Sequence, residues 1–193
     1  AAELARAELD GEPDVVVDAT GRHALVERAL ELGHVKGSRN DVALFAHLDR
    51  ATLEEKGHIH VDRLQQGWSW RIPLRDRTSV GVVIRRDHLP RYGETAEAQY
   101  DALLEADPRL AARVAGGARL TSVVKYTNYQ RHARQLYGRN WVLVGDAAGF
   151  VDPIFSTGVY LALHGAEMAA DALLAGGRAP LVDYEREWLA ELG

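Results

Sequence analysis

The stretch from Trp141 to Leu163 limits the folds open to this chain more than any other. It opens with Trp141–Gly145, a short apolar run rich in valine, which is typical of a buried strand. Small residues then lead to Asp152–Pro153, and from about Ser156 the apolar residues follow the spacing of a helix that ends at Gly176–Gly177. The apolar face predicted for this helix consists of Val159, Ala162, Ala166, Ala169, Ala170 and Leu173.

A strand, a loop and a helix start without an obvious cap form a suitable site for an anionic ligand. The free N–H groups of the first helical turn and the positive end of the helix dipole point into the loop. The alternative is an ordinary strand-to-helix connection in which Ser156 or Thr157 caps the helix. Small residues allow a flat ligand to approach the backbone, and here these are Ala147, Ala148, Gly149, Ser156 and Gly158.

The residues from Gly145 to Val159, GDAAGFVDPIFSTGV, resemble a known motif. It is the third flavin-contacting motif of FAD-dependent monooxygenases of the p-hydroxybenzoate hydroxylase fold, and within that class the string is most similar to flavin-dependent halogenases. The resemblance implies that Asp146 binds the ribitol and ribose part of FAD. It also implies that the backbone N–H groups of Thr157 and Gly158 bind a halide such as chloride. The residues implied to line the flavin are Gly145, Ala147, Pro153, Gly158 and Val159.

A second strand, turn and helix precede this region. Asp14–Asp18 is a valine run that ends in an acid, which predicts a parallel strand buried on both faces. A helix is predicted from His23 to Leu32, stopped by Gly33. The DATGR string between them resembles the strand-end motif near FAD in the same class, which implies that Ala19, Thr20 and Gly21 lie near its adenosine diphosphate half. The alternative is a turn glycine after a core strand.

The middle of the chain changes to a strand-after-strand pattern, which predicts an antiparallel sheet that forms a wall over a ligand. Two helices, Glu94–Ala106 and one that starts at Asp107–Pro108, are expected to cover the sheet. Arg131–Asn140 is predicted to be a loop. The strands expected are Val42–Leu48, His58–Leu64, Trp68–Ile72, Thr78–Arg85 and Leu120–Asn128.

Two tryptophans stand out inside this sheet. The residues from Trp68 to Pro73, WSWRIP, match the WxWxIP motif of flavin-dependent halogenases at every fixed position. Trp68 and Trp70 are two residues apart, so both point to one face of the strand and make a large rigid wall. The resemblance implies that they serve catalysis by crowding the substrate side of the flavin and discouraging hydroxylation. The alternative is a pair of core tryptophans that anchor the sheet.

Composition and charge exclude several classes of function. The formal net charge is −5 with acids and bases interspersed, so no basic footprint for nucleic acid is visible. No apolar run is long enough to span a membrane, and zero cysteines exclude disulfides and cysteine zinc sites.

His58, His60 and Asp62 alternate onto one face, but without a third ligand cluster nearby they are interpreted as edge-strand residues and no metal is predicted. A soluble cytoplasmic protein is expected.

The resemblance to the family begins partway into the family's pattern of motifs. No GxGxxG, the motif that normally opens a dinucleotide-binding fold, occurs in these residues, and no lysine matches the one thought to carry activated halogen in the family. We therefore expect a fragment of a longer protein, inactive alone, and Ala1–Leu9 is compatible with a short helix. Phe155 stands where tryptophan-type halogenases carry a glutamate, which favours phenol- or pyrrole-type halogenases or non-halogenating relatives.

The sequence thus predicts an α/β fold (an α+β mixture). A partial FAD-binding parallel βα layer, 1–40 and 120–193, would carry an inserted antiparallel-sheet substrate domain, 41–119. The predicted function is that of a FAD-dependent, halogenase-like monooxygenase that acts on a small electron-rich aromatic, free or carrier-tethered, with a flavin reductase as partner. The alternatives are a FAD-dependent aromatic hydroxylase, a geranylgeranyl-reductase-like enzyme or a non-catalytic fragment. The sequence specifies neither the substrate, nor the halide, nor the oligomeric state.

Overall fold

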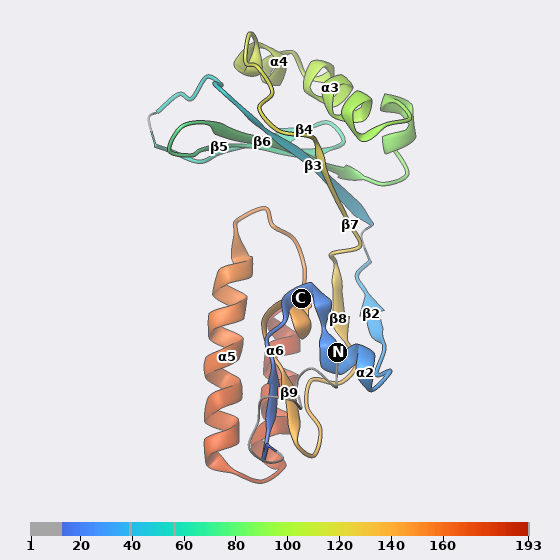
Figure 1. Cartoon of the computed structure of the whole chain (residues 1–193), viewed down its shortest axis with the longest axis vertical. Helices are drawn as coiled ribbons and strands as arrows, with labels where there is room; N and C mark the ends of the chain where they lie inside the picture. The colour runs from blue at the N-terminus through green and yellow to red at the C-terminus, as the bar shows by residue number, and fades with distance from the viewer. Residues whose placement is uncertain (1–12, 39, 56, 193) are drawn as a thin grey trace. The chain divides into compact units, whose positions relative to one another are not determined.

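The computed structural model describes residues 13–38, 40–55 and 57–192, which form two units (Figure 1). Unit 1 combines residues 13–38 with 129–192, and unit 2 comprises residues 40–128. The helix considered for Ala1–Leu9 lies outside the described residues. Helices, a parallel strand pair and an antiparallel sheet together confirm the predicted α/β mixture. The division into domains at residues 40 and 119 stays a prediction.

Unit 1 is built on a parallel strand pair, β1 (Val16–Asp18) and β9 (Trp141–Leu143). Val142 and Leu143 are fully buried, as a strand of the core requires. The prediction that the first strand is buried on both faces is wrong in this structure, because Val17 is 52% exposed and only Asp18 of β1 is buried. Among the described residues β9 is the only strand that pairs with β1, so little of its valine surface is covered.

Three short strands form a second sheet in unit 1, in the order β10, β8, β2, and all its pairs are antiparallel. These are β10 (Gly149–Phe150), β8 (Arg131–Ala133) and β2 (His34–Lys36). The loop predicted from Arg131 to Asn140 is therefore wrong at its start. Arg131 is held there by Glu27 of α2 (Leu25–Ala29), whose buried carboxylate lies 2.5 Å from the arginine and 3.2 Å from His34 Nδ1.

Two antiparallel helices complete unit 1, α5 (Thr157–Ala175) and α6 (Ala179–Glu191), which lie side by side (Figure 1). The helix predicted from Ser156 is present, but Val159 of its predicted apolar face is 71% exposed. Gly165 fixes the true contact face, because a Cβ there would lie 2.3 Å from Nε1 of the fully buried Trp188. The buried residues of α5 are Leu161, Gly165, Ala169 and Ala172.

Unit 2 is a five-stranded antiparallel sheet in the order β4, β5, β6, β3, β7. Its strands are β3 (Asp41–Leu48), β4 (His60–Leu64), β5 (Gly67–Pro73), β6 (Thr78–Arg85) and β7 (Val124–Thr127). Each overlaps one of the strands expected from the short β-like runs separated by turn residues.

Helices cover one face of this sheet, α3 (Ala96–Ala106) and α4 (Pro108–Val114), with the short 3-10 turn η2 (Leu89–Tyr92) before them (Figure 1). Asp107 caps α4 as predicted, since its carboxylate accepts hydrogen bonds from the backbone N–H groups of Arg109 and Leu110. The core under the helices is formed by Val42, Leu44, Ala46, Leu48, Val80, Val82, Ile84, Leu89, Tyr100, Leu103, Leu104 and Leu110. No helix of the described part of the chain is both long and apolar enough to span a membrane.

Candidate functional site

The turns that follow β1 and β9 meet in unit 1. The two strands run parallel, and the N–H of Val144 donates to the carbonyl of Asp18 at 3.0 Å, so both strand ends lie at one edge. The 3-10 turns η1 (Gly21–His23) and η3 (Gly145–Ala147) pack against each other there. The structure therefore brings the predicted residues of the DATGR turn close to those of the Gly-Asp turn.

The DATGR turn is organised by Asp18, which sequence reasoning did not assign. Its buried carboxylate accepts hydrogen bonds from the N–H of Thr20 at 3.0 Å, the hydroxyl of Thr20 at 2.6 Å and the N–H of Val26 at 2.7 Å. An acid that ends a valine run, with a helix start a few residues later, is the signal that could have identified it. Ala19 and Thr20 are exposed at this edge and Gly21 turns the chain with a φ of +63°.

Asp146 has a different environment from Asp18. Burial raises the pKa of the Asp146 carboxyl above its ordinary value, and the positive charge of Arg22 acts in the opposite direction. Gly145, which precedes it with a φ of +58°, sits against α5, where an added Cβ would lie 3.4 Å from the Cβ of Ala162. Asp146 is thus a partly desolvated acid at the meeting point of two strand ends and a helix.

Replacing Asp146 with asparagine is expected to raise the unfolding midpoint of the ligand-free chain at neutral pH. Because the folded-state pKa lies above the ordinary value of 3.8, ionisation is less favourable in the folded protein than in the unfolded one. This carboxyl therefore lowers the free energy of unfolding as the pH rises above the ordinary pKa. It has no such effect at a pH where it is protonated in both the folded and the unfolded state. Calorimetric midpoints of wild type and Asp146→Asn should coincide near about pH 3 and diverge by about pH 7. A difference that is independent of pH would contradict the assignment.

The start of α5 lacks a side-chain cap. Ser156 occupies the cap position in a left-handed conformation, with a φ of +55°, and its hydroxyl makes no capping hydrogen bond. The Thr157 hydroxyl donates instead to the carbonyl of Asp152 at 3.2 Å. The alternative in which Ser156 is an ordinary cap is therefore wrong, and the N–H groups of the first turn have no side-chain acceptor from the cap residue.

The surface beside this helix start is apolar. Gly158 lies against Phe150, since a Cβ at Gly158 would be 3.0 Å from Cε2 of that ring. Phe155 is 78% exposed. Together with the exposed Val159, these residues place apolar side chains next to the positive end of a helix, an arrangement that suits a flat ligand with an anionic or electron-rich edge. Pro153 lies in the same loop, three residues before the cap position.

The paired tryptophans of unit 2 lie on the face of the sheet opposite to its helices. The ring centroids of Trp68 and Trp70 are 5.5 Å apart, and Phe45 lies 5.8 Å from Trp70 on the other side. Val61 and Tyr126, whose partners in the strand register are Trp70 and Ala43, belong to the same face and are partly exposed. Trp68 is 6% exposed, whereas Trp70 and Phe45 are partly exposed. These three close rings with their exposed apolar neighbours form what we call the aromatic face, a surface that suits an aromatic ligand.

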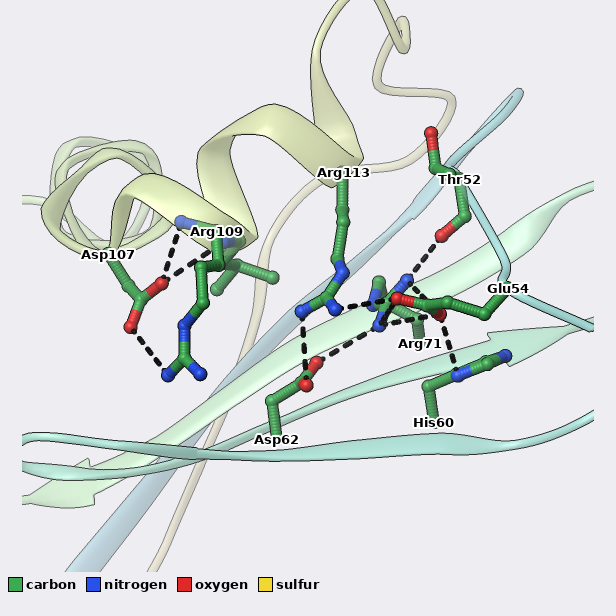
Figure 2. A network of polar contacts seen from close by, with 9 residues as sticks. Thr52, Glu54, His60, Asp62, Arg71, Asp107, Arg109 and Arg113 are labelled. Atoms are coloured by element: carbon green, nitrogen blue, oxygen red, sulfur yellow. Dashed lines mark hydrogen bonds and ion pairs between the residues drawn. The ribbon is translucent and has the colours of Figure 1, made fainter.

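The opposite side of β5 carries Arg71, which sequence reasoning passed over (Figure 2). Its side chain is 1% exposed, and its Nη2 lies 3.1 Å from Asp62 and 3.3 Å from Glu54. Nη1 of Arg71 also donates to the carbonyl of Thr52. Arg113 of α4 contacts the same two carboxylates, Asp62 at 3.1 Å and Glu54 at 2.6 Å. Arg71 therefore links the strand that carries the two tryptophans to β4 through Asp62 and to the 49–55 segment through Glu54. The same two carboxylates extend the link to Arg113 of α4.

The histidines considered as metal ligands have other partners. His60 Nδ1 lies 2.9 Å from Glu54, and His58, which precedes β4, contacts Glu55 at 3.2 Å. Asp62 is engaged by the two arginines. Within residues 13–38, 40–55 and 57–192, no group of three or more histidine, aspartate or glutamate side chains is arranged to hold a metal ion.

Comparison with known proteins places this fold in one class. The myxobacterial chondrochloren halogenase CndH, an FAD-dependent halogenase, superposes with a TM-score of 0.78 and 30% identity, over 93% of this chain and 45% of its own. The tryptophan 2-halogenase of Chondromyces crocatus is 36% identical over 165 residues, 81% of this chain and 32% of the relative. The 1H-pyrrole-2-carbonyl-(peptidyl-carrier protein) chlorinase of Pseudomonas fluorescens is 30% identical over 183 residues, 90% and 41% respectively.

The fold is thus that of the flavin-dependent halogenases, a class of enzymes that use FAD. The family described as tryptophan halogenase matches residues 5–188, and the chain belongs to it. The family predicted from the two motifs is confirmed. The chain spans about a third to two fifths of the length of the two curated relatives.

Proposed function

We propose that the protein containing this chain is a FAD-dependent halogenase of a small electron-rich aromatic substrate. The observation that carries the proposal is the aromatic face, where the rings of Trp68 and Phe45 lie 5.5 and 5.8 Å from that of Trp70 on the side of the sheet opposite to α3 and α4. A large, rigid aromatic surface binds planar apolar substrates by contact area at little cost in conformational entropy. Trp68 and Trp70 are the residues to which we assign the catalytic role.

The residues of unit 1 fit a flavin nucleotide. Asp146 offers a carboxylate to ribitol and ribose hydroxyls, and its partial desolvation strengthens such hydrogen bonds. Ala19, Thr20 and Gly21 are assigned to the adenosine diphosphate half. Gly145, Pro153, Gly158 and Val159 are assigned to the surface beside the flavin, whereas Ala147, which the motif also implied, is 0% exposed and lies behind that surface. When bound, a reduced flavin supplies the redox chemistry that turns dioxygen and halide into the halogenating agent, while the protein binds and orients the reactants.

The halide is assigned to the backbone N–H groups of Thr157 and Gly158. This assignment is supported by the helix start itself, because Ser156 provides no side-chain cap and the helix dipole is positive at this end. Chloride or bromide accepts hydrogen bonds from such groups in the way that other anions do.

The substrate class that we favour is a phenol or a pyrrole. Phe155 gives an apolar, uncharged neighbour to the helix start, where a carboxylate would bind an amino group. One relative is named as a chlorinase of a pyrrole-2-carbonyl group on a peptidyl carrier protein, and another as a tryptophan 2-halogenase. A free phenol, a carrier-tethered pyrrole and free tryptophan are therefore the three substrates to compare. A flavin reductase is the expected partner, since the flavin must be delivered reduced.

The test uses the complete protein with a flavin reductase, FAD, dioxygen and bromide. Bromination of a phenol, of a carrier-tethered pyrrole or of monochlorodimedone, in a bromide-dependent manner, is the expected result. Mass spectrometry of the products gives the ratio of brominated to hydroxylated product. Hydroxylation that is independent of halide would instead establish the alternative of a FAD-dependent aromatic hydroxylase.

Exchange of Trp70 for phenylalanine is expected to change the product partition. The smaller ring removes part of the wall that the two indoles make and also removes the indole N–H, so the hydroxylated or uncoupled fraction should rise at the expense of halogenated product. We expect a loss of about 10-fold in the ratio of halogenated to hydroxylated product, which corresponds to about 1.4 kcal/mol. The products of wild type and variant are compared by chromatography at equal flavin turnover. An unchanged partition would remove Trp70 from the catalytic role.

A further inference from the structure

We propose that Ser79 and Gly81 of β6, together with Phe45 of β3, are positioning residues that fix the indole of Trp70. They lie outside the WxWxIP string, and the strand register brings them to the indole. Gly81 is the register partner of both Trp70 and Phe45. The consequence for catalysis rests on the proposed function, whereas the orientation of the ring does not.

Gly81 provides the space that the indole fills. A Cβ built on Gly81 would lie 2.2 Å from Cζ2 of Trp70 and 2.4 Å from Cε2 and Cη2, so the six-membered part of the indole rests directly on the glycine backbone. Gly81 lies inside β6 and does not have a positive φ, so the backbone conformation does not require glycine here. Glycine weakens the interior of a strand, and close approach of another group is the common reason for it. The indole of Trp70 is that group.

Ser79 fixes the polar edge of the same ring. The indole Nε1–H of Trp70 donates to the Ser79 hydroxyl at 3.1 Å. Ser79 is two residues before Gly81 on the same face of β6 and is 9% exposed. A hydrogen bond at one edge and contact with Gly81 under the six-membered ring together select one side-chain orientation, because a flip of the indole would break both.

Phe45 and Trp68 are the aromatic neighbours of the ring. Phe45 is tilted by 45° at 5.8 Å and Trp68 by 43° at 5.5 Å, so Trp70 packs near both rings. On the other face of the sheet, the side that faces α4, the Arg71 contacts hold the strand itself (Figure 2). Gly81, Ser79, Phe45 and Trp68 thus all contribute to the position of Trp70, which is the preorganisation that a catalytic wall needs.

Two spectroscopic measurements test the orientation in the complete protein, independently of activity. Two indoles this close should give an exciton couplet in the far-ultraviolet circular dichroism, which Trp70→Phe assigns by abolishing it. Gly81→Ala is expected to lose most of this couplet because the methyl group displaces the ring. Ser79→Ala is expected to accelerate hydrogen exchange of the Trp70 indole N–H by about 2- to 10-fold, the effect of losing one neutral hydrogen bond. The matched control is Ser69→Ala in β5, whose hydroxyl is buried on the opposite face without a hydrogen-bond partner.

The product partition then connects orientation to chemistry. If the proposed function holds, Gly81→Ala and Ser79→Ala should lower the halogenated fraction in the direction of Trp70→Phe, while Ser69→Ala should not. A couplet unchanged in folded Gly81→Ala, or an indole exchange rate unchanged in Ser79→Ala, would overturn the inference. Should Gly81→Ala fail to fold, the exchange rate in Ser79→Ala decides it. If the wild-type protein does not halogenate but the spectra of Gly81→Ala and Ser79→Ala change as expected, the positioning role is supported and the proposed function is excluded.

Discussion

Replacement of Arg71 by leucine should destabilise unit 2 by about 3 kcal/mol, since removal of one partner from a buried ion network leaves the others without compensation. Arg71 is 1% exposed and contacts Asp62, Glu54 and the carbonyl of Thr52. Without it, two carboxylates share the single guanidinium of Arg113. Urea unfolding followed by tryptophan fluorescence reports on unit 2 through Trp68 and Trp70, which lie on the strand that carries Arg71.

Arg109 provides the matched control within the same region (Figure 2). Its side chain is 70% exposed and lies 3.6 Å from Asp107, so Arg109→Leu should change the free energy of unfolding by no more than about 0.5 kcal/mol. Equal effects of the two substitutions would show that the buried network contributes no more than a surface ion pair. Because the chain has two units, the unfolding of each is fitted separately.

The second large effect is expected on the affinity for FAD. Asp146→Ala in the complete protein should weaken FAD binding by about 10- to 100-fold, the range that corresponds to the loss of one or two hydrogen bonds to a charged acceptor. The carboxylate lies at the meeting point of the β1 and β9 strand ends, and its partial burial makes its hydrogen bonds stronger than those of a surface acid. Fluorescence titration with FAD measures the dissociation constant directly.

Two further variants sharpen this experiment. Asp171→Ala, which removes an exposed acid of α5, should leave FAD affinity unchanged. Asp146→Asn keeps one acceptor oxygen and should lie between wild type and Asp146→Ala, although it is the variant expected to stabilise the ligand-free chain at neutral pH. Higher stability together with weaker binding would identify Asp146 as a residue retained for its ligand. FAD binding that is the same in all variants would exclude Asp146 from the site.

The long elements of this fold could be predicted from sequence because local pattern and tertiary environment agree in them. The strands of unit 2 are runs rich in β-branched and aromatic residues, and Asp107–Pro108 marks a helix start by two independent preferences. The strands missed, such as His34–Lys36 and Arg131–Ala133, are three residues long and polar. They are strands because they pair with each other and because Glu27 engages their side chains, which no local pattern announces.

The residues of the candidate site also divide into those that the sequence predicted and those that it did not. The tryptophans and the Gly-Asp turn were predicted because each belongs to a recognisable string. Gly81 and Ser79 were not, since their role arises from a register between strands that only the fold specifies. The predicted buried face of α5 was wrong at Val159 because small apolar residues surround the whole helix. The contact of Gly165 with Trp188 selects the side that is buried.

The way in which unit 2 is inserted into unit 1 has a consequence for how such proteins can be altered. The chain leaves unit 1 after β2 and returns to it at β8, and these strands are paired, with the N–H of Gly37 donating to the carbonyl of Gln130 at 2.9 Å. Beyond this point β3 and β7 are paired as well, Val42 opposite Thr127. Entry and exit are therefore neighbours, and residues 40–128 form a cassette with adjacent ends. Such a cassette is suited to transplantation between relatives, so that the aromatic face could be exchanged while unit 1 is retained.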